Sequence, residues 1–395
     1  MRQWGGNRMI VVADDFTGAA EIAAVSFEGG YSARVHRVKA PIDLQPDCHL
    51  VLDTDSRLKS SEQTKAVLAP ISKALSSFPA IPVYKKVDSI LRGNVSLELC
   101  LLAQILGKKR ILLLPQNPSG GRTIKDRTYR INGIPLSQTE FASDPTHPAQ
   151  SDSPLDLLGQ THGWSVSYCS IGDALPTAGI VILEAERDSE VQRWSKQVKP
   201  DDLAAGGRDF YRHLVGTTQR EPRPFDLPTS TLLIQGTLSP ERERLHQALK
   251  GNTYLDLQLS PAANPQKSID LCASSASDMI SSNGLAILGF RRENTSSESA
   301  AAEIERALRA VIATALNSSK NVAIHLAIEG GATAALILKI LNLDTLEVIQ
   351  IWGDGVVSLQ SEKSPNLTIT TKPGSYAWPP ALVEAFCPKV IEQEV

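Results

Sequence analysis

Two adjacent carboxylates, Asp14 and Asp15, follow a short apolar segment near the start of the chain and precede Thr17 and Gly18. A carboxylate can accept the proton of a substrate hydroxyl, and a glycine lets the backbone approach a ligand closely. One of the two aspartates could instead do no more than bind the amides of its own loop. The pair is therefore the first candidate for general-base chemistry.

A second cluster places both signs of charge around one turn. It contains Lys85, Lys86, Asp88, Ser89 and Arg92. A guanidinium can hold a substrate carboxylate with two parallel hydrogen bonds, and a lysine can neutralise phosphoryl charge. A structural ion pair between Asp88 and Arg92 accounts for the same residue types, and both roles can coexist.

Three further segments carry polar or glycine-rich sequences suited to anions. Residues 119–123 (SGGRT) resemble an anion-binding nest, although a flexible turn has the same composition. In the second half, Gly330, Gly331, Ala332 and Thr333 lie between a predicted strand and a predicted helix, where backbone amides favour a phosphate. Residues 372–375 (KPGS), which include Gly374, are a weaker candidate of the same kind.

Other common catalytic centres have no sequence support. The seven histidines are dispersed without the spacing of a zinc site, and the sequence contains no GxSxG, Walker A, HEXXH or GxGxxG motif. Hydrolase, P-loop and dinucleotide-dehydrogenase functions are therefore disfavoured.

The elements that must position these residues follow a strand–loop–helix pattern in the first half. Apolar strands are predicted at residues 9–13, 49–52, 82–87 and 110–114. Thr17 is expected to cap the first helix, and Ser60 with Gln63 forms a capping box for the next. Because the carboxyl ends of parallel strands share one sheet edge, the strand-end residues should converge there. They are Asp14, Asp15, Asp55, Arg57, Asp88, Arg92 and Arg122.

The second half is predicted to repeat the α/β pattern. Strands are expected at 231–235, 322–328 and 367–371, and helices at 299–316 and from 331 to 341. Residues 125–163 read as irregular, with a turn at Asn132-Gly133, and could form a flap or an oligomer contact, such as that of a homodimer. A proline-rich linker at 216–230 separates two expected α/β domains, residues 1–225 and 226–395, each with a largely parallel sheet flanked by helices.

Composition narrows the class of protein. A chain of 395 residues exceeds what one core usually organises, and 42% hydrophobic residues suffice for two. The 40 basic and 43 acidic residues nearly cancel, which argues against nucleic acid or an anionic membrane as partner. Five scattered cysteines and the lack of a signal-like or membrane-length apolar segment predict a cytoplasmic protein.

Taken together, the motifs resemble the four-carbon acid sugar kinase family, also described as DUF1537, whose members include D-threonate, D-erythronate and 3-oxo-tetronate kinases. The matching segments are residues 11–19 (VVADDFTGA), 53–57 (DTDSR), 85–94 (KKVDSILRGN), 121–123 (GRT) and 132–148 (NGIPLSQTEFASDPTHP). They cover most of the N-terminal half in the family's order.

The resemblance implies an N-terminal domain that binds a sugar acid, a C-terminal domain that binds ATP, and phosphorylation of a substrate hydroxyl with Mg²⁺ bridging the phosphates. By position, the acid-sugar site would comprise Asp14, Asp15, Arg57, Lys86, Asp88, Ser89 and Arg92. The catalytic set would be Asp15, Asp88 and Arg92, with Asp15 slightly preferred as the base. ATP would contact Thr237, Ser239, Gly330, Gly331, Ala332, Thr333 and Gly374. No metal ligand is assigned. Catalysis would consist mainly of positioning and charge neutralisation.

The second half departs from the family's pattern. Ala332 stands where family members usually carry an acidic residue, and Thr237 stands where they carry a serine. Glu329 or Asp354 could replace the lost carboxylate. A sugar-acid sensor without catalysis, or a kinase of another small hydroxy acid, therefore stays an alternative.

Overall fold

The computed structural model describes Trp4, Gly6 and residues 8–38, 48–143, 148–217, 225–236, 254–259, 265–292, 297–318, 322–353, 355–374 and 376–386. The chain divides into two compact units, Met1–Pro222 and Arg223–Val395. Both contain helices and mostly parallel strands, which confirms the predicted α/β class. The predicted domain boundary after residue 225 stays a prediction, and residues 218–224 lie outside the described part.

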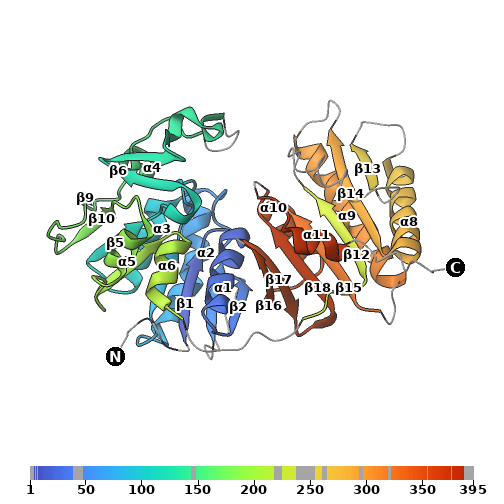
Figure 1. Cartoon of the computed structure of the whole chain (residues 1–395), viewed down its shortest axis with the longest axis horizontal. Coiled ribbons are helices and arrows are strands. Elements are labelled where there is room, and N and C mark those ends of the chain that lie inside the picture. The colour runs from blue at the N-terminus through green and yellow to red at the C-terminus, as the bar shows by residue number, and fades with distance from the viewer. Residues whose placement is uncertain are drawn as a thin grey trace. The chain divides into compact units, whose positions relative to one another are not determined.

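The first unit is built on one parallel sheet, which runs from blue to green in Figure 1. Its strand order is β2-β3-β1-β4-β11-β5-β10-β9. The bounds are β1 Met9–Ala13, β2 Ala33–Arg37, β3 His49–Asp53, β4 Val83–Lys86, β5 Arg110–Leu114, β9 Val166–Cys169, β10 Gly179–Leu183 and β11 Asp202–Gly206. The four strands predicted in this half are confirmed, and three of them, β3, β1 and β4, are neighbours.

Helices cover both faces of this sheet. They are α1 Phe16–Glu28, α2 Ser61–Ser76, α3 Val95–Ile105, α4 Pro154–Leu158, α5 Asp188–Ser195 and α6 Arg208–Val215. The capping box of Ser60 and Gln63 is confirmed. The predicted cap of α1 was wrong: Asp15, not Thr17, is the N-cap, because its side chain reaches back to the amide of Gly18.

Alternation along the strands sorts side chains between the two faces. Ile10 and Val12 of β1 belong to the core that α2 and α3 complete. On β4, Lys85 points to the α3 side and Lys86 to the α1 side, as their ion pairs with Glu98 and Glu21 show. Two consecutive lysines therefore reach opposite layers.

A small antiparallel sheet stands beside the main one, drawn in teal in Figure 1. It contains β6 Arg122–Lys125, β7 Thr128–Ile131 and β8 Ile134–Pro135, and the short 3-10 helices around it are Pro118–Gly120, Leu136–Gln138 and Glu140–Ser143. Asn132 and Gly133 make the predicted turn, with positive φ at both residues. The described residues between 125 and 163 thus contain more regular structure than predicted. The strands were missed because such short runs show no readable alternation.

The strands of the second unit are ordered β13-β14-β12-β15-β18-β17-β16. The bounds are β12 Ser230–Gln235, β13 Tyr254–Leu259, β14 Leu285–Arg292, β15 Ile324–Glu329, β16 Thr345–Gly353, β17 Val356–Ser361 and β18 Ser364–Lys372. The first five in this order are parallel, whereas β17 runs antiparallel to β18 and β16. The expected strands are present, and the antiparallel ones were not predicted.

Four described helices accompany this sheet: α8 Pro265–Asn283, α9 Ser297–Ser318, α10 Gly331–Ile340 and α11 Pro380–Phe386. α8 and α9 pack against each other (orange in Figure 1). α11 adds Leu382 and Phe386 to a cluster that contains Leu233 and Trp378. None of the described helices combines the length and apolar composition that a membrane crossing requires.

Candidate functional site

The predicted residues of the first unit gather where β1, β3 and β4 end. Asp14 and Asp15 follow β1, Arg57 follows β3, and Asp88 follows β4, and these three strands are adjacent. Thr54, directly after β3, ties its loop to the end of β1, because its hydroxyl donates to the carbonyl of Ala13 at 2.8 Å. The convergence predicted from the strand ends is therefore observed for this group.

Arg57 is the centre of the cluster. Its Nε and second terminal nitrogen donate to the two oxygens of Asp14 at 2.7 and 3.0 Å. Its first terminal nitrogen lies 2.8 Å from Asp15 Oδ2 and 3.5 Å from Asp88 Oδ1. One guanidinium thus binds all three carboxylates.

Arg92 is paired in the same manner. It donates from Nε and a terminal nitrogen to Asp88 at 3.0 and 2.9 Å, and its amide donates to the same carboxylate at 3.2 Å. The turn that permits this geometry includes Leu91 with a φ of 63°. The structural ion pair considered for Asp88 and Arg92 therefore exists.

The three aspartates differ in exposure and in protonation. The side chain of Asp15 is 22% exposed, against 3% for Asp14 and 6% for Asp88. Burial and the negative charge of Asp14 raise the pKa of Asp15, although Arg57 opposes them. Asp15 is thus the carboxylate that both reaches solvent and takes a proton most readily.

Asp14 and Asp88 are held ionised. Burial raises the pKa of each, but the positive charges around them outweigh it, so both values are lowered. Arg57 and Lys85 act on Asp14, and Arg57 and Arg92 act on Asp88. These two carboxylates are therefore better suited to fixing Arg57 than to exchanging protons.

Lys86 lies against the first turns of α1. Its Nζ is 3.3 Å from Glu21 and donates to the carbonyl of Val87 at 3.0 Å. Gly18 leaves the room for this, because a Cβ there would stand 2.8 Å from Asp15 Oδ1 and 3.3 Å from Lys86 Nζ. The glycine after the aspartate pair is thus needed to seat both groups.

Below the cluster lies a buried ion pair that sequence reasoning missed. Lys85 Nζ is 2.7 Å from Glu98 Oε2, with both side chains almost fully buried. Ser56 donates to the other oxygen of Glu98. A single glutamate on the otherwise apolar face of α3 (VSLELCLLAQI) is the signal that could have identified it.

Ser89 and Asp53 lie at the margin of this group. The carbonyl of Ser89 accepts a hydrogen bond from the hydroxyl of Tyr129 at 2.7 Å, which ties β7 to the loop after β4. Burial raises the pKa of Asp53 to about 7, and the charges of Asp15 and Asp55 add to the effect. Within the described part of the chain, one oxygen of Asp53 has no hydrogen-bond partner.

In the second unit, three buried polar residues end adjacent parallel strands. Gln235, Glu329 and Lys372 are in register on β12, β15 and β18 and are at most 1% exposed. Glu329 lies 3.7 Å from Lys372 Nζ and accepts from the indole of Trp378 at 3.3 Å. Neither polar atom of the Gln235 side-chain amide has a hydrogen-bond partner among the described residues, which is costly for a buried group.

Two glycines shape the loop ends beside these residues. A Cβ on Gly236 would lie 1.9 Å from the hydroxyl of Thr333 and 2.8 Å from the carbonyl of Glu329. Gly330, with a φ of 97°, is the N-cap of α10. The unpartnered amide and the close glycine turns fit a phosphate-bearing ligand at a helix N-terminus.

The other predicted nucleotide contacts are distributed unevenly. Gly331 and Thr333 are half-buried in the first turn of α10, whereas Ala332 is exposed. Gly374 follows Lys372, whose Nζ donates to the carbonyl of Pro373 at 3.0 Å. Thr237, Ser239 and Asp354 lie outside the described residues. Gln235, unpredicted, could have been noticed as a polar residue that ends an apolar strand before a glycine.

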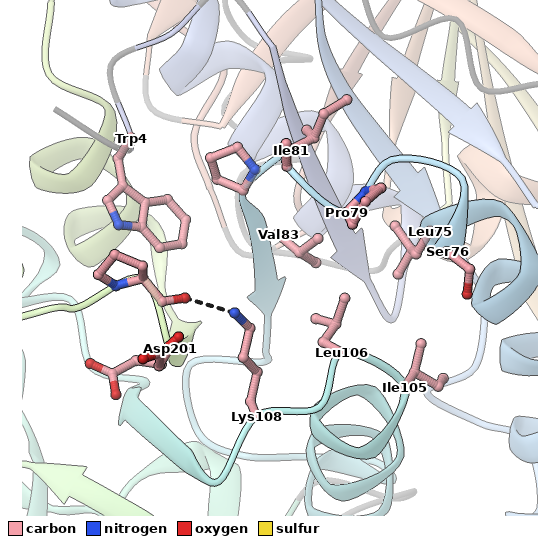
Figure 2. A pocket seen from close by; sticks show the side chains of 14 residues that line it. Trp4, Leu75, Ser76, Pro79, Ile81, Val83, Ile105, Leu106, Lys108 and Asp201 are labelled. Carbon is pink, nitrogen blue, oxygen red and sulfur yellow. Dashed lines mark hydrogen bonds between the residues drawn. The ribbon is translucent and has the colours of Figure 1, made fainter. Parts of the chain in front are cut away.

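One pocket of the first unit lies away from this cluster. A pocket of about 480 Å³ lies at the amino ends of β4 and β11, and Figure 2 shows Trp4, Val83 and Leu106 among its walls. A second, of about 400 Å³, adjoins the aspartate cluster and includes Arg92 and Gly93. The chemistry favours the second, since none of the predicted site residues lines the first.

Comparison with known proteins identifies the family. Residues 9–196 match the family described as "Sugar-binding N-terminal domain". Over 152 residues the chain is 35% identical to a D-threonate kinase of Salmonella typhimurium, covering 38% of this chain and 36% of that protein. The chain belongs to the four-carbon acid sugar kinase family.

Further members of this acid sugar kinase family extend the match. A D-erythronate kinase of Heliobacterium modesticaldum is 25% identical over 230 residues, 55% of this chain and 52% of that protein. The alignments thus span between about a third and a half of the length of these curated relatives. A Haemophilus influenzae protein of the DUF1537 family has the same fold, with a TM-score of 0.72 at 16% identity over 96% of this chain and 99% of that one.

The described residues of this family member include no group of three or more His, Cys, Asp or Glu side chains suited to hold a metal ion. Glu329, directly before α10, is the described carboxylate that adjoins the candidate phosphate site.

Proposed function

We propose that the chain is an ATP-dependent kinase of a four-carbon sugar acid such as threonate, erythronate or an oxo-tetronate. The first unit would be the acid-binding domain and the second the nucleotide-binding domain. The observation that carries the proposal is the carboxylate cluster around Arg57, in which one member, Asp15, has a raised pKa and is accessible. The match to the sugar-binding domain family spans residues 9–196, which include this cluster.

In this proposal Asp15 accepts the proton of the attacking hydroxyl. Arg57, fixed by Asp14 and Asp88, orients Asp15 from one side, and the amide of Gly18 orients it from the other. Lys86, beside Gly18, supplies positive charge for the transferred group. Mg-ATP would supply the γ-phosphoryl group, with its phosphates at Gly330, Gly331, Thr333 and Gly374, and Glu329 would face the accompanying Mg²⁺.

Coupled ADP release tests the proposal directly. Wild-type protein should release ADP with D-threonate, D-erythronate or an oxo-tetronate. The Asp15→Asn variant should lose about 10²- to 10⁴-fold in kcat, because the base is removed while the shape is kept. Asp55→Asn in the neighbouring loop is the matched control, since the Asp55 side chain is 63% exposed and its ion pair among the described residues is with Lys59. A folded wild-type protein that releases no ADP with a broad panel of sugar acids would contradict the proposal.

A sugar-acid sensor is the second candidate, and one observation favours it. The first turn of α10 contains no acidic residue. A ligand that binds the native state raises apparent stability, so thermal melting separates the two functions. A kinase should be stabilised by Mg-ATP and by the acid, and a sensor by the acid alone.

A further inference from the structure

The guanidinium of Arg122 stands apart from the other arginines near the candidate acid site. Among the described residues it makes no hydrogen bond and no ion pair, and its Nε is buried without a partner. Arg57 and Arg92, by contrast, are bound to aspartates through two or more nitrogens each. A buried N–H donor without an acceptor is unfavourable, which points to a ligand at the Nε of Arg122.

The backbone around Arg122 is rigidly placed. Gly121 before it has a φ of 71°, and a Cβ there would stand 2.0 Å from Asn132 Oδ1. Arg122 and Ile124 share a face of β6, and Ile124 is buried in the core and bonded to the backbone of Ala185 at 3.1 and 3.2 Å. The side chain is therefore directed from the small sheet toward the body of the first unit.

Phe141 connects Arg122 to the acid site. The Cζ atom of Arg122 lies 5.9 Å from the centre of the Phe141 ring, and the Cζ atom of Arg92 lies 5.7 Å from the same point. Tyr129 gives a second link: it donates to Ser89, next to Asp88, and the charges of Arg122 and Asp88 act on its pKa in opposite directions. Arg122 thus contacts the same aromatic ring as Arg92, the partner of Asp88.

The distribution of charge decides which arginine is available to a substrate anion. Arg57 and Arg92 each already use two nitrogens to bind an aspartate, whereas the Nε of Arg122 has no hydrogen-bond partner among the described residues. We propose that Arg122 is the residue that receives the carboxylate of the sugar acid, with Phe141 holding its guanidinium in place. This inference rests on the proposed function, and it leaves Arg57 and Arg92 to position the aspartates.

Isothermal titration calorimetry on the full chain tests the assignment with two probes. D-threonate carries the carboxylate, and threitol has the same four-carbon chain without it. Arg122→Gln should weaken binding of threonate by about 10- to 100-fold, because charge-assisted hydrogen bonds are lost, and should leave threitol binding unchanged. Arg122→Lys should restore part of the affinity, since it keeps the charge but not the fork.

Arg130→Gln is the matched control. Arg130 lies on the same hairpin, in register with Thr123 and therefore on the opposite face from Arg122. The Arg130→Gln variant should bind threonate with the affinity of the wild type. The inference is overturned if Arg122→Gln binds threonate within twofold of wild type, or if it loses the same factor for both probes. A wild-type protein that binds neither threonate nor erythronate overturns the proposed function as well, so the two failures are distinguishable.

Discussion

Three carboxylates around one arginine acquire different properties from their surroundings. Asp14 and Asp88 are covered and opposed by cations, whereas Asp15 is partly open and feels the charge of Asp14. Environment rather than residue type thus separates a base from its supports.

The raised pKa of Asp15 predicts a pH dependence of turnover. The base must be unprotonated, so kcat/KM should rise with pH through the pKa of Asp15 and level off above it. The midpoint should lie above the ordinary value of 3.8. A pH–rate profile with D-threonate measures this limb, and a profile that stays flat down to the acid limit of folding would remove Asp15 from the role of base.

The aspartates, Arg57 and Arg92 were readable from the sequence because each follows an apolar strand. Their mutual pairing was not, since side-chain partners depend on loop shapes that the strand pattern leaves open. Glu21 and Glu98, which pair with Lys86 and Lys85, lie on helices. A prediction based on residues at strand ends therefore could not find them.

At the scale of elements, the buried pair of Lys85 and Glu98 joins β4 to α3. Glu98→Leu should destabilise the protein by about 3–5 kcal/mol, because it leaves the ammonium of Lys85 buried without its partner. The double variant Lys85→Met/Glu98→Leu should recover much of that loss. Urea unfolding measures both, and a single variant as stable as wild type would show that the pair is solvated.

Gly236, directly after β12, is the basis of a prediction about nucleotide binding. Gly236→Ala would force a methyl group into Thr333 and the carbonyl of Glu329, so the first turn of α10 must shift. Stabilisation by Mg-ATP in thermal melting should fall, while that by the sugar acid should persist. Gly107→Ala is the steric control, because a Cβ at Gly107 would have no atom within 4 Å. The positive φ of Gly107 makes this control the greater strain on the backbone.

Strand–loop–helix units were the part of the fold that sequence could predict, since buried parallel strands are continuous apolar runs. β16 and β17 escaped prediction because their residues alternate irregularly, with shifts of register between them. The cap of α1 was misplaced by two residues because both Asp15 and Thr17 are good caps, and only the loop geometry chooses between them.

For the whole molecule, Asp53 predicts how stability responds to pH. Its folded pKa of about 7 lies above the ordinary 3.8, so the unfolded chain releases this proton first. Wild-type stability should therefore decrease as pH rises from about 4 to 7, by up to about 4 kcal/mol for this group, and level off above. Asp53→Asn should match wild type near pH 4 and exceed it at pH 8. Urea unfolding at both pH values is the measurement, and an equal difference at the two would exclude Asp53 as the source.

Asp15 also begins a helix. One of its oxygens accepts a hydrogen bond from the amide of Gly18, and the other lies beside Arg57. The proposed proton acceptor is therefore also the N-cap of α1. A proton that Asp15 takes from a substrate hydroxyl would weaken the hydrogen bond of this N-cap until the proton is released. The opening turn of α1 would then loosen and tighten once per catalytic cycle, and its motion would follow the progress of the reaction.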